Sequence, residues 1–157
     1  MRLRLLGLVF SILAALSVSS PAVAQLYMNG AGGVYSNLES SGLAGRFALG
    51  AEPLDWIKVE GSVLATGHDQ ACCSLALDAT GWLTVLGAGP LSLGLGGGAG
   101  MLSFVDINDP SQDYDWTPYF VSGIEAEFAL TRHFSFFGRG ELGLGELRGY
   151  AGIKLGF

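Results

Sequence analysis

The stretch ATGWLTVLGAGPLSLGLGGGAGMLSFV, residues 79–105, contains no charged residue and is longer than a helix needs to cross a bilayer. It nevertheless makes a poor helix, because it holds eight glycines and a central proline, Pro90. Each glycine costs a helix roughly 1 kcal/mol relative to alanine, and an interior proline costs about 3 kcal/mol. Its leucines recur instead at every second position, which is the period of a strand. The stretch therefore predicts two strands that reverse at residues 87–90.

The N-terminus has the layout of a secretory signal. Arg2 and Arg4 precede an apolar run over residues 5–18, and the small residues Ala-Val-Ala follow at 22–24. The alternative is an uncleaved anchor helix, but the apolar run is short for a membrane span. We therefore expect a signal peptide over residues 1–24 and a mature domain over residues 25–157.

The composition of the mature chain excludes some functions. It keeps fourteen acidic residues but only six basic ones once Arg2 and Arg4 are removed, so nucleic acid is not an expected partner. Charged residues make up 14% of the chain, against about 25% in soluble domains, and 25 residues are glycine. An exported chain that is poor in charge and has no convincing membrane helix points to a closed barrel, the other structure that satisfies backbone groups in lipid.

Eight alternating segments can be placed along the mature chain. They cover residues 26–35, 42–52, 56–66, 75–86, 91–104, 117–130, 134–144 and 148–157. Short connections (53–55, 87–90 and 131–133) alternate with longer ones (36–41, 67–74 and 105–116), and a very short fourth loop near 145–147 departs from this pattern. Short turns on one side and longer loops on the other are typical of outer-membrane barrels.

Charged residues fall on one face of these segments. The pairs that share a face are Arg46 with Glu52, Lys58 with Glu60, Glu125 with Glu127, Arg139 with Glu141, and Arg148 with Lys154. The opposite face carries no charge and is rich in leucine, isoleucine, valine and phenylalanine. A soluble lipocalin-like barrel would turn the apolar face inward. The many small residues on the polar face, such as those of the glycine row 94–100, suit a narrow lumen instead, and we expect Trp82 to turn inward with them.

Aromatic residues near the ends of the predicted strands favour the same arrangement. Membrane barrels carry aromatic girdles at both interfaces. The residues expected to form them are Tyr27, Trp56, Trp116, Tyr119, Phe134 and Phe157.

The C-terminal segment, Tyr-Ala-Gly-Ile-Lys-Leu-Gly-Phe over residues 150–157, resembles the C-terminal signature of bacterial outer-membrane barrels. Gly152, Leu155 and Phe157 fit its glycine, apolar and aromatic positions, whereas Tyr150 stands where a polar residue is usual. The whole mature chain resembles the small eight-stranded barrels of the OmpA/OmpX and opacity-protein type. The resemblance implies an outer-membrane location, contact with outer-membrane lipids, and recognition of the C-terminal strand by the barrel-insertion machinery.

On this interpretation the lumen holds a nearly balanced set of charges. Five are positive (Arg46, Lys58, Arg139, Arg148 and Lys154) and six are negative (Glu52, Glu60, Asp78, Glu125, Glu127 and Glu141). Buried charges are tolerable when they are paired and hydrogen-bonded, and barrels of this size are normally filled by side chains. We therefore predict a closed polar network, with a narrow ion path through the same residues as the alternative.

A catalytic alternative comes from the outer-membrane lipid A deacylases, which use a His-x-Ser pair and a glutamate on a small barrel. His133 and Ser135, with Glu141 or Glu146 downstream, superficially match that pattern. The predicted topology puts His133 in a periplasmic turn, far from lipid A in the outer leaflet, and the position after the serine differs from that family. We therefore predict no catalytic centre.

Two loops carry other reactive or acidic groups. His68, Cys72 and Cys73 could suggest a metal site, but adjacent cysteines rarely give closed ligand geometry, and a vicinal or an intermolecular disulfide is the alternative. The acidic loop over residues 105–116 lacks the spacing of a calcium loop and is expected to be solvated. The sequence thus predicts a non-enzymatic eight-stranded antiparallel outer-membrane barrel without cofactor or metal, acting in envelope structure or surface contact.

Overall fold

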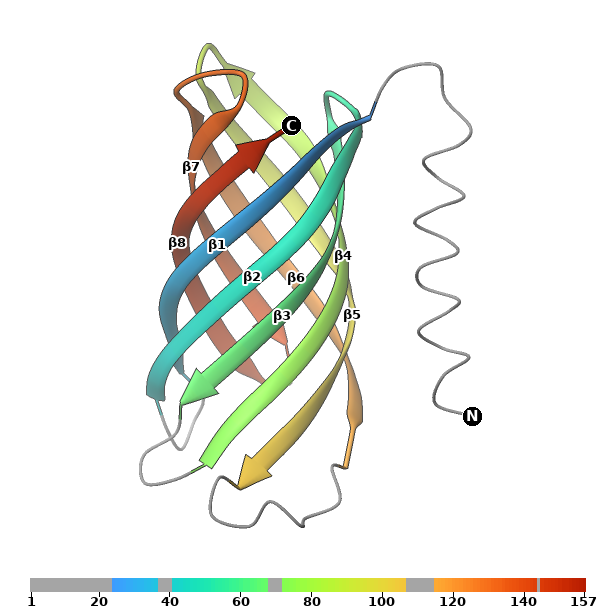
Figure 1. The fold of residues 1–157 in the computed structure, drawn as a ribbon, viewed down its shortest axis with the longest axis vertical. Helices are drawn as coiled ribbons and strands as arrows, with labels where there is room; N and C mark the ends of the chain where they lie inside the picture. The colour runs from blue at the N-terminus through green and yellow to red at the C-terminus, as the bar shows by residue number, and fades with distance from the viewer. Residues whose placement is uncertain (1–23, 37–40, 68–71, 107–114, 144) are drawn as a thin grey trace.

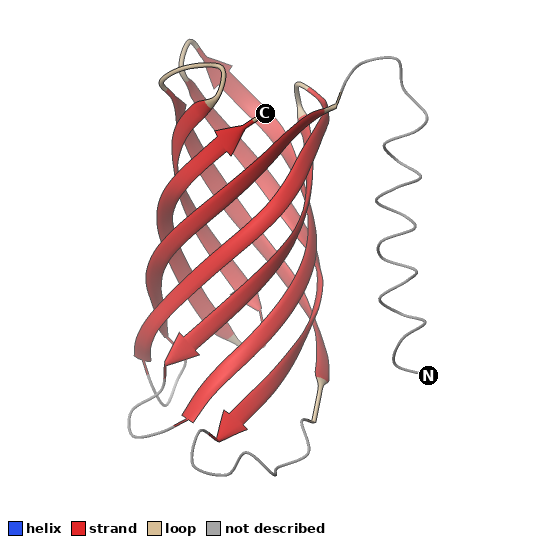
Figure 2. Ribbon diagram, in the orientation of Figure 1, coloured by secondary structure: helices blue, strands red, loops and turns tan. Residues whose placement is uncertain are grey.

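The computed structural model of the protein describes residues 24–36, 41–67, 72–106, 115–143 and 145–157. All regular secondary structure in these ranges is β-strand (Figure 2). Apart from Ala24, the predicted signal peptide lies outside the described residues. So do His68, the side chain of Cys72 and most of the acidic loop.

Eight strands form one closed antiparallel barrel (Figure 1). Each strand pairs with the next along the chain, and the last pairs with the first over Tyr27–Gly156 to Ser36–Leu147. This confirms the predicted all-β fold. The strands are β1 (Gln25–Ser36), β2 (Ser41–Leu54), β3 (Ile57–Gly67), β4 (Cys72–Ala88), β5 (Leu91–Asp106), β6 (Thr117–Ala129), β7 (Phe134–Gly143) and β8 (Glu146–Gly156).

The two ends of the barrel differ. At one end, called the turn side, short turns join β2 to β3, β4 to β5 and β6 to β7, and the start of β1 and the C-terminus lie at this same end (Figure 1). The opposite end is called the loop side. The predicted reversal of the uncharged stretch is confirmed, because β4 and β5 pair and turn at residues 89–90. Gly89 has a φ of 60°, a left-handed conformation that favours glycine.

Some strand boundaries differ from the prediction. β4 begins at Cys72 and ends at Ala88, and β8 begins at Glu146 because Gly145, with a φ of 74°, completes a tight turn. An irregularity in the pairing of β4 with β5 lies between Thr84 and Leu86, and another lies between Ala51 and Leu54 of β2. Such bulges break the period of two, which is why periodicity alone placed the C-terminal ends of β4 and β2 too early.

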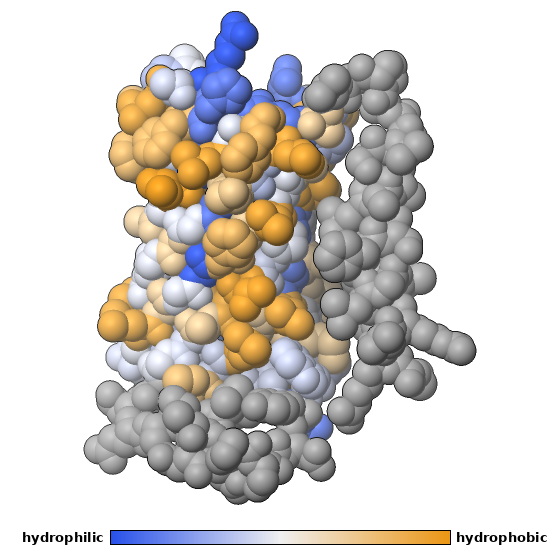
Figure 3. Space-filling model, in the orientation of Figure 1, coloured by the Kyte–Doolittle hydropathy of each residue, from blue (hydrophilic) through white to orange (hydrophobic). Residues whose placement is uncertain are grey.

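The outer surface of the barrel is apolar. Large hydrophobic side chains on every strand are exposed, among them Leu43, Phe47, Leu83, Leu95, Phe120, Ile124, Phe136, Leu147 and Ile153. Figure 3 shows hydrophobic residues over much of the near face, concentrated toward both ends. Within the described ranges, no helix is long and apolar enough to cross a membrane. Since the apolar face points outward, the arrangement is the inverse of a soluble lipocalin-like barrel.

Candidate functional site

All the charged residues expected on the polar face line the lumen. Their inward direction follows from the alternation of buried and exposed positions along each strand. Nine of these side chains are buried: Arg46, Lys58, Glu60, Asp78, Glu125, Glu127, Arg139, Glu141 and Arg148. Glu52 and Lys154 lie at the turn side, half-buried, where the Lys154 Nζ atom is 2.8 Å from Glu52 Oε1.

Glu60 is the centre of this lumen network. Its carboxylate pairs with the guanidinium groups of Arg46 and Arg139. It also accepts hydrogen bonds from Tyr27, Asn29, Thr80 and Trp82, at 3.1 to 3.2 Å. These donors come from β1, β2, β4 and β7, so one side chain of β3 ties together five strands. Hydrogen bonds of this kind offset the cost of burying the charge.

Trp82 packs against Arg139 of the network. The Arg139 guanidinium lies 4.0 Å from the indole ring centre, a cation–π distance, and Trp82 Nε1 donates to Thr80 Oγ1 at 3.0 Å as well as to Glu60. The ring fits because β5 passes it with glycine. A β-carbon at Gly96 would overlap the indole and lie 2.8 Å from the Gly81 carbonyl oxygen. The glycine row therefore makes room for Trp82, which the sequence predicted to face inward.

Replacing Gly96 by alanine tests this fit. We expect Gly96→Ala to lower the free energy of unfolding by about 1–3 kcal/mol, the usual cost of overpacking a filled interior. Gly45→Ala is the matched control, because a β-carbon there meets no atom within 4 Å. Urea titration in lipid vesicles measures both variants. Equal effects of the two substitutions would contradict a close fit between Gly96 and the indole.

A second group of charges lies toward the turn side. Lys58 contacts Glu125, at 2.7 Å, and Glu127. Lys154 also pairs with Glu127, and the Ser135 hydroxyl donates to Glu127 Oε1 at 2.6 Å. Arg139 bonds to Glu125 through its Nε atom at 2.9 Å, which joins this group to Glu60. The ion pairs are therefore continuous from the middle of the barrel to its turn side.

A third group of bonded side chains lies toward the loop side. It includes Glu146, which was not predicted to face the lumen. Arg148 donates to Glu146 Oε2 at 3.1 Å and to the Tyr119 hydroxyl at 3.2 Å, and Tyr119 donates to Asp78. Glu146 was assigned to a loop, but it shares the face of Arg148 and belongs to β8. Its parity with Arg148 was the signal that could have placed it in the lumen.

Glu141 is a lumen carboxylate with few stabilising contacts. It is 1% exposed, yet neither carboxylate oxygen receives a hydrogen bond from the described residues. Its cation contact is with Arg139 Nη1 at 3.6 Å. Glu141 and Glu60 are thus equally buried carboxylates in very different surroundings.

The expectation of aromatic girdles was wrong for two residues. Tyr27 and Tyr119 are 2% and 5% exposed and face the lumen, because they share the parity of Asn29 and Glu125. Position near a strand end does not decide the face; parity does. Trp56 and Phe157 are exposed at the turn side, while Trp116 and Phe134 are half-buried.

The structure does not bring together the residues of the catalytic alternative, His133 and Ser135. His133 is exposed in the β6–β7 turn, where its backbone N–H donates to Thr131 Oγ1 at 3.2 Å. Ser135 is buried inside the barrel and bonded to Glu127. A serine nucleophile needs its hydroxyl beside an imidazole, and no hydrogen bond joins these two side chains among the described residues.

The remaining candidates lie elsewhere. Cys73 is a free thiol in β4, and the side chain of Cys72 lies outside the described residues. In the part of the chain that the structure describes, no group of three or more His, Cys, Asp or Glu side chains could hold a metal ion. At the C-terminus, Leu155 and Phe157 point outward, whereas Tyr150 and Gly152 face the lumen.

Comparison with solved structures places this geometry among known barrels. Neisserial surface protein A matches with a TM-score of 0.66 at 12% identity, over 85% of this chain and 97% of that one. The N-terminal barrel domain of Pseudomonas aeruginosa OprF matches with a TM-score of 0.60 at 18% identity over the same shares. The Yersinia pestis attachment invasion locus protein, Ail, matches with a TM-score of 0.53 at 14% identity, again over 85% and 97%.

The fold is that of the small eight-stranded outer-membrane barrels. No protein-family model and no curated protein sequence matches the chain. Identities below a fifth establish the shared fold alone, so the role of this barrel has to be argued from its own residues.

Proposed function

We propose that this protein is a non-enzymatic integral barrel of the bacterial outer membrane, exported with a cleaved signal peptide. The observation that carries the proposal is the inverted distribution of residues: exposed apolar side chains cover the outside, and the charged side chains form ion pairs inside. Burying apolar surface in lipid is favourable, whereas charged groups in the hydrocarbon region are costly. The arrangement suits a bilayer around the barrel.

The filled lumen supports a role in envelope structure or surface contact. Ion pairs between inward side chains join β3, β6, β7 and β8 across the barrel. Removing one partner of a buried pair costs about 3–5 kcal/mol, so these contacts hold the interior in a filled arrangement. A closed barrel without a catalytic centre would meet its partners through the connections at the loop side.

The C-terminal strand supports recognition by the barrel-insertion machinery. Phe157 is 65% exposed on the outer face, and its backbone N–H donates to the Leu26 carbonyl at 2.8 Å, beside the closing β1–β8 pair. Gly152 and Leu155 lie on β8, the strand that completes the barrel, and Phe157 follows it directly, with its ring accessible from outside.

Fractionation of expressing cells tests the proposed location. We expect the protein in the outer-membrane fraction, without residues 1–24, and with a faster gel mobility in unheated samples than in boiled ones. A folded barrel resists the detergent and migrates compactly, whereas heat unfolds it. Recovery only from the soluble periplasm would contradict the proposal, and an uncut N-terminus in the mass spectrum would contradict the cleaved signal.

A further inference from the structure

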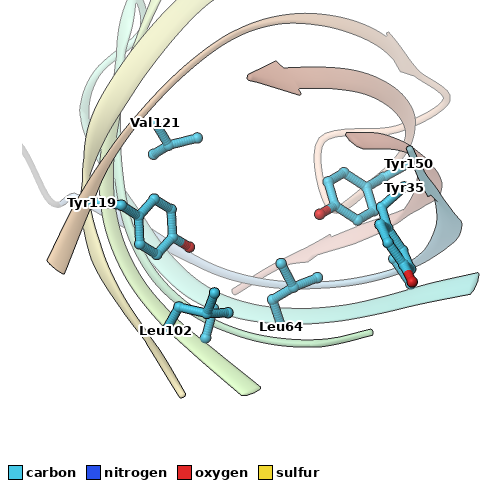
Figure 4. Close-up of a cluster of buried hydrophobic side chains, with 8 residues drawn as sticks. Tyr35, Leu64, Leu102, Tyr119, Val121 and Tyr150 are labelled. Atoms are coloured by element: carbon cyan, nitrogen blue, oxygen red, sulfur yellow. The ribbon is translucent and has the colours of Figure 1, made fainter. Parts of the chain in front are cut away.

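The loop-side part of the lumen differs from the rest, because apolar and tyrosine side chains fill it. These residues are called the loop-side plug: Tyr35, Ala44, Leu64, Ala76, Leu102, Tyr119, Val121 and Tyr150. All are buried and in contact as one cluster (Figure 4). They come from seven strands. β7 contributes Gly143, where a β-carbon would lie 3.3 Å from the Tyr119 ring.

The position of the plug follows from the strands. Tyr35 is next to the end of β1, and Leu102 lies near the end of β5, both at the loop side. The ion pairs of Lys58 and Lys154 lie toward the opposite end. There the lumen is partly open to solvent, with the Glu52 and Lys154 side chains 21% and 15% exposed. Leu64, by contrast, is 1% exposed.

One ion pair lies against the plug. Arg148 is fully buried with Glu146, and its guanidinium carbon lies 5.3 Å from the Tyr119 ring centre. Arg148 and Glu146 therefore already pair with each other. Of the three tyrosine hydroxyls in the plug, those of Tyr35 and Tyr119 donate to Gly67 and Asp78, and that of Tyr150 has no hydrogen-bond partner among the described residues. An entering ion would meet that single neutral oxygen and otherwise apolar surface. Hydrophobic constrictions exclude ions by excluding water, since an ion that loses its hydration without new ligands is strongly destabilised.

We propose that the barrier to ion passage through this barrel is the loop-side plug rather than the ion-pair network, and that the lumen behind the plug favours cations. Five carboxylates (Glu52, Glu60, Glu125, Glu127 and Glu141) face four cationic side chains (Arg46, Lys58, Arg139 and Lys154) there. Acidic linings select cations in other pores. The inference rests on the proposed function, because it assumes a closed barrel in a membrane.

Conductance of the purified, refolded protein in planar bilayers tests this. We expect no channel openings from wild type. Leu64→Ser with Leu102→Ser shortens two plug side chains and makes them polar. We expect this double variant to give channels in at least tenfold more insertion trials than wild type. A KCl gradient is expected to show a reversal potential on the cation-selective side. Leu102→Ser alone serves if the double variant fails to show the compact gel mobility of a folded barrel.

Glu52→Gln with Lys154→Gln provides the competing variant, because it removes the ion pairs of Lys154 with Glu52 and Glu127 and leaves the plug intact. It is expected to stay silent. If this variant gives channels while the folded plug variants give none, the plug is not the barrier. The proposed function, a closed wild-type barrel, would be unaffected by that result. Channels from both double variants would also overturn the plug as the barrier. Channels from wild type would instead refute the closed lumen of the proposed function, and anion selectivity of the opened variant would refute the charge argument.

Discussion

Glu60→Gln is expected to lower the free energy of unfolding by about 3–5 kcal/mol, the cost of removing one partner from a buried ion pair. Two guanidinium groups, those of Arg46 and Arg139, would lose their shared carboxylate inside the barrel. An amide oxygen can still accept some of the hydrogen bonds, but it cannot balance two buried positive charges. Urea titration in phospholipid vesicles, followed by tryptophan fluorescence and gel mobility, measures the change.

Glu141→Gln is the matched control for this substitution. Both residues are carboxylates of the lumen network and are 2% exposed or less, so burial and chemistry are the same. Glu141 receives no hydrogen bond from the described residues and meets Arg139 at 3.6 Å. Removing its charge is therefore expected to cost less than about 1 kcal/mol, or to stabilise the barrel. Equal losses at the two positions would show that Glu60 is not the centre of the network.

Ile124→Arg is expected to destabilise the membrane-inserted barrel by about 2–4 kcal/mol, the cost of a cation on the lipid face at mid-depth. Ile124 is 63% exposed and lies in the middle of β6, on the face opposite to Glu125. We also expect a lower yield of folded barrel in vesicles, because the arginine has no counter-charge on the apolar surface. Urea titration measures the loss of stability, and the refolding yield measures insertion.

The same substitution near a strand end provides the comparison. Leu26 is 56% exposed and is the second residue of β1, at the turn side. An arginine there can reach the interface, so Leu26→Arg is expected to cost at most about 1 kcal/mol. A soluble barrel would show no dependence on depth. Similar, small effects at both positions in lipid vesicles would therefore contradict insertion of the barrel with this face toward the lipid.

Much of the fold could be predicted because a strand has a period of exactly two residues. In the uncharged stretch the parity of the leucines indicated two strands where length alone suggested one helix. The same rule put Arg46, Glu60, Arg139 and their companions on one face. It failed where the backbone departs from regular pleating: the bulge between Thr84 and Leu86, and the tight turn at Gly145 that moves Glu146 into β8.

The sequence by itself determined which residues face the lumen and which face outward, because both are local consequences of alternation. Which charges pair could be decided only by the tertiary structure. Glu60 meets Arg139 across 79 positions of the chain, and closure of the barrel is what brings them together. The same holds for the plug. Its apolar residues come from seven strands, and each is an ordinary inward side chain until the closed barrel packs them into one layer.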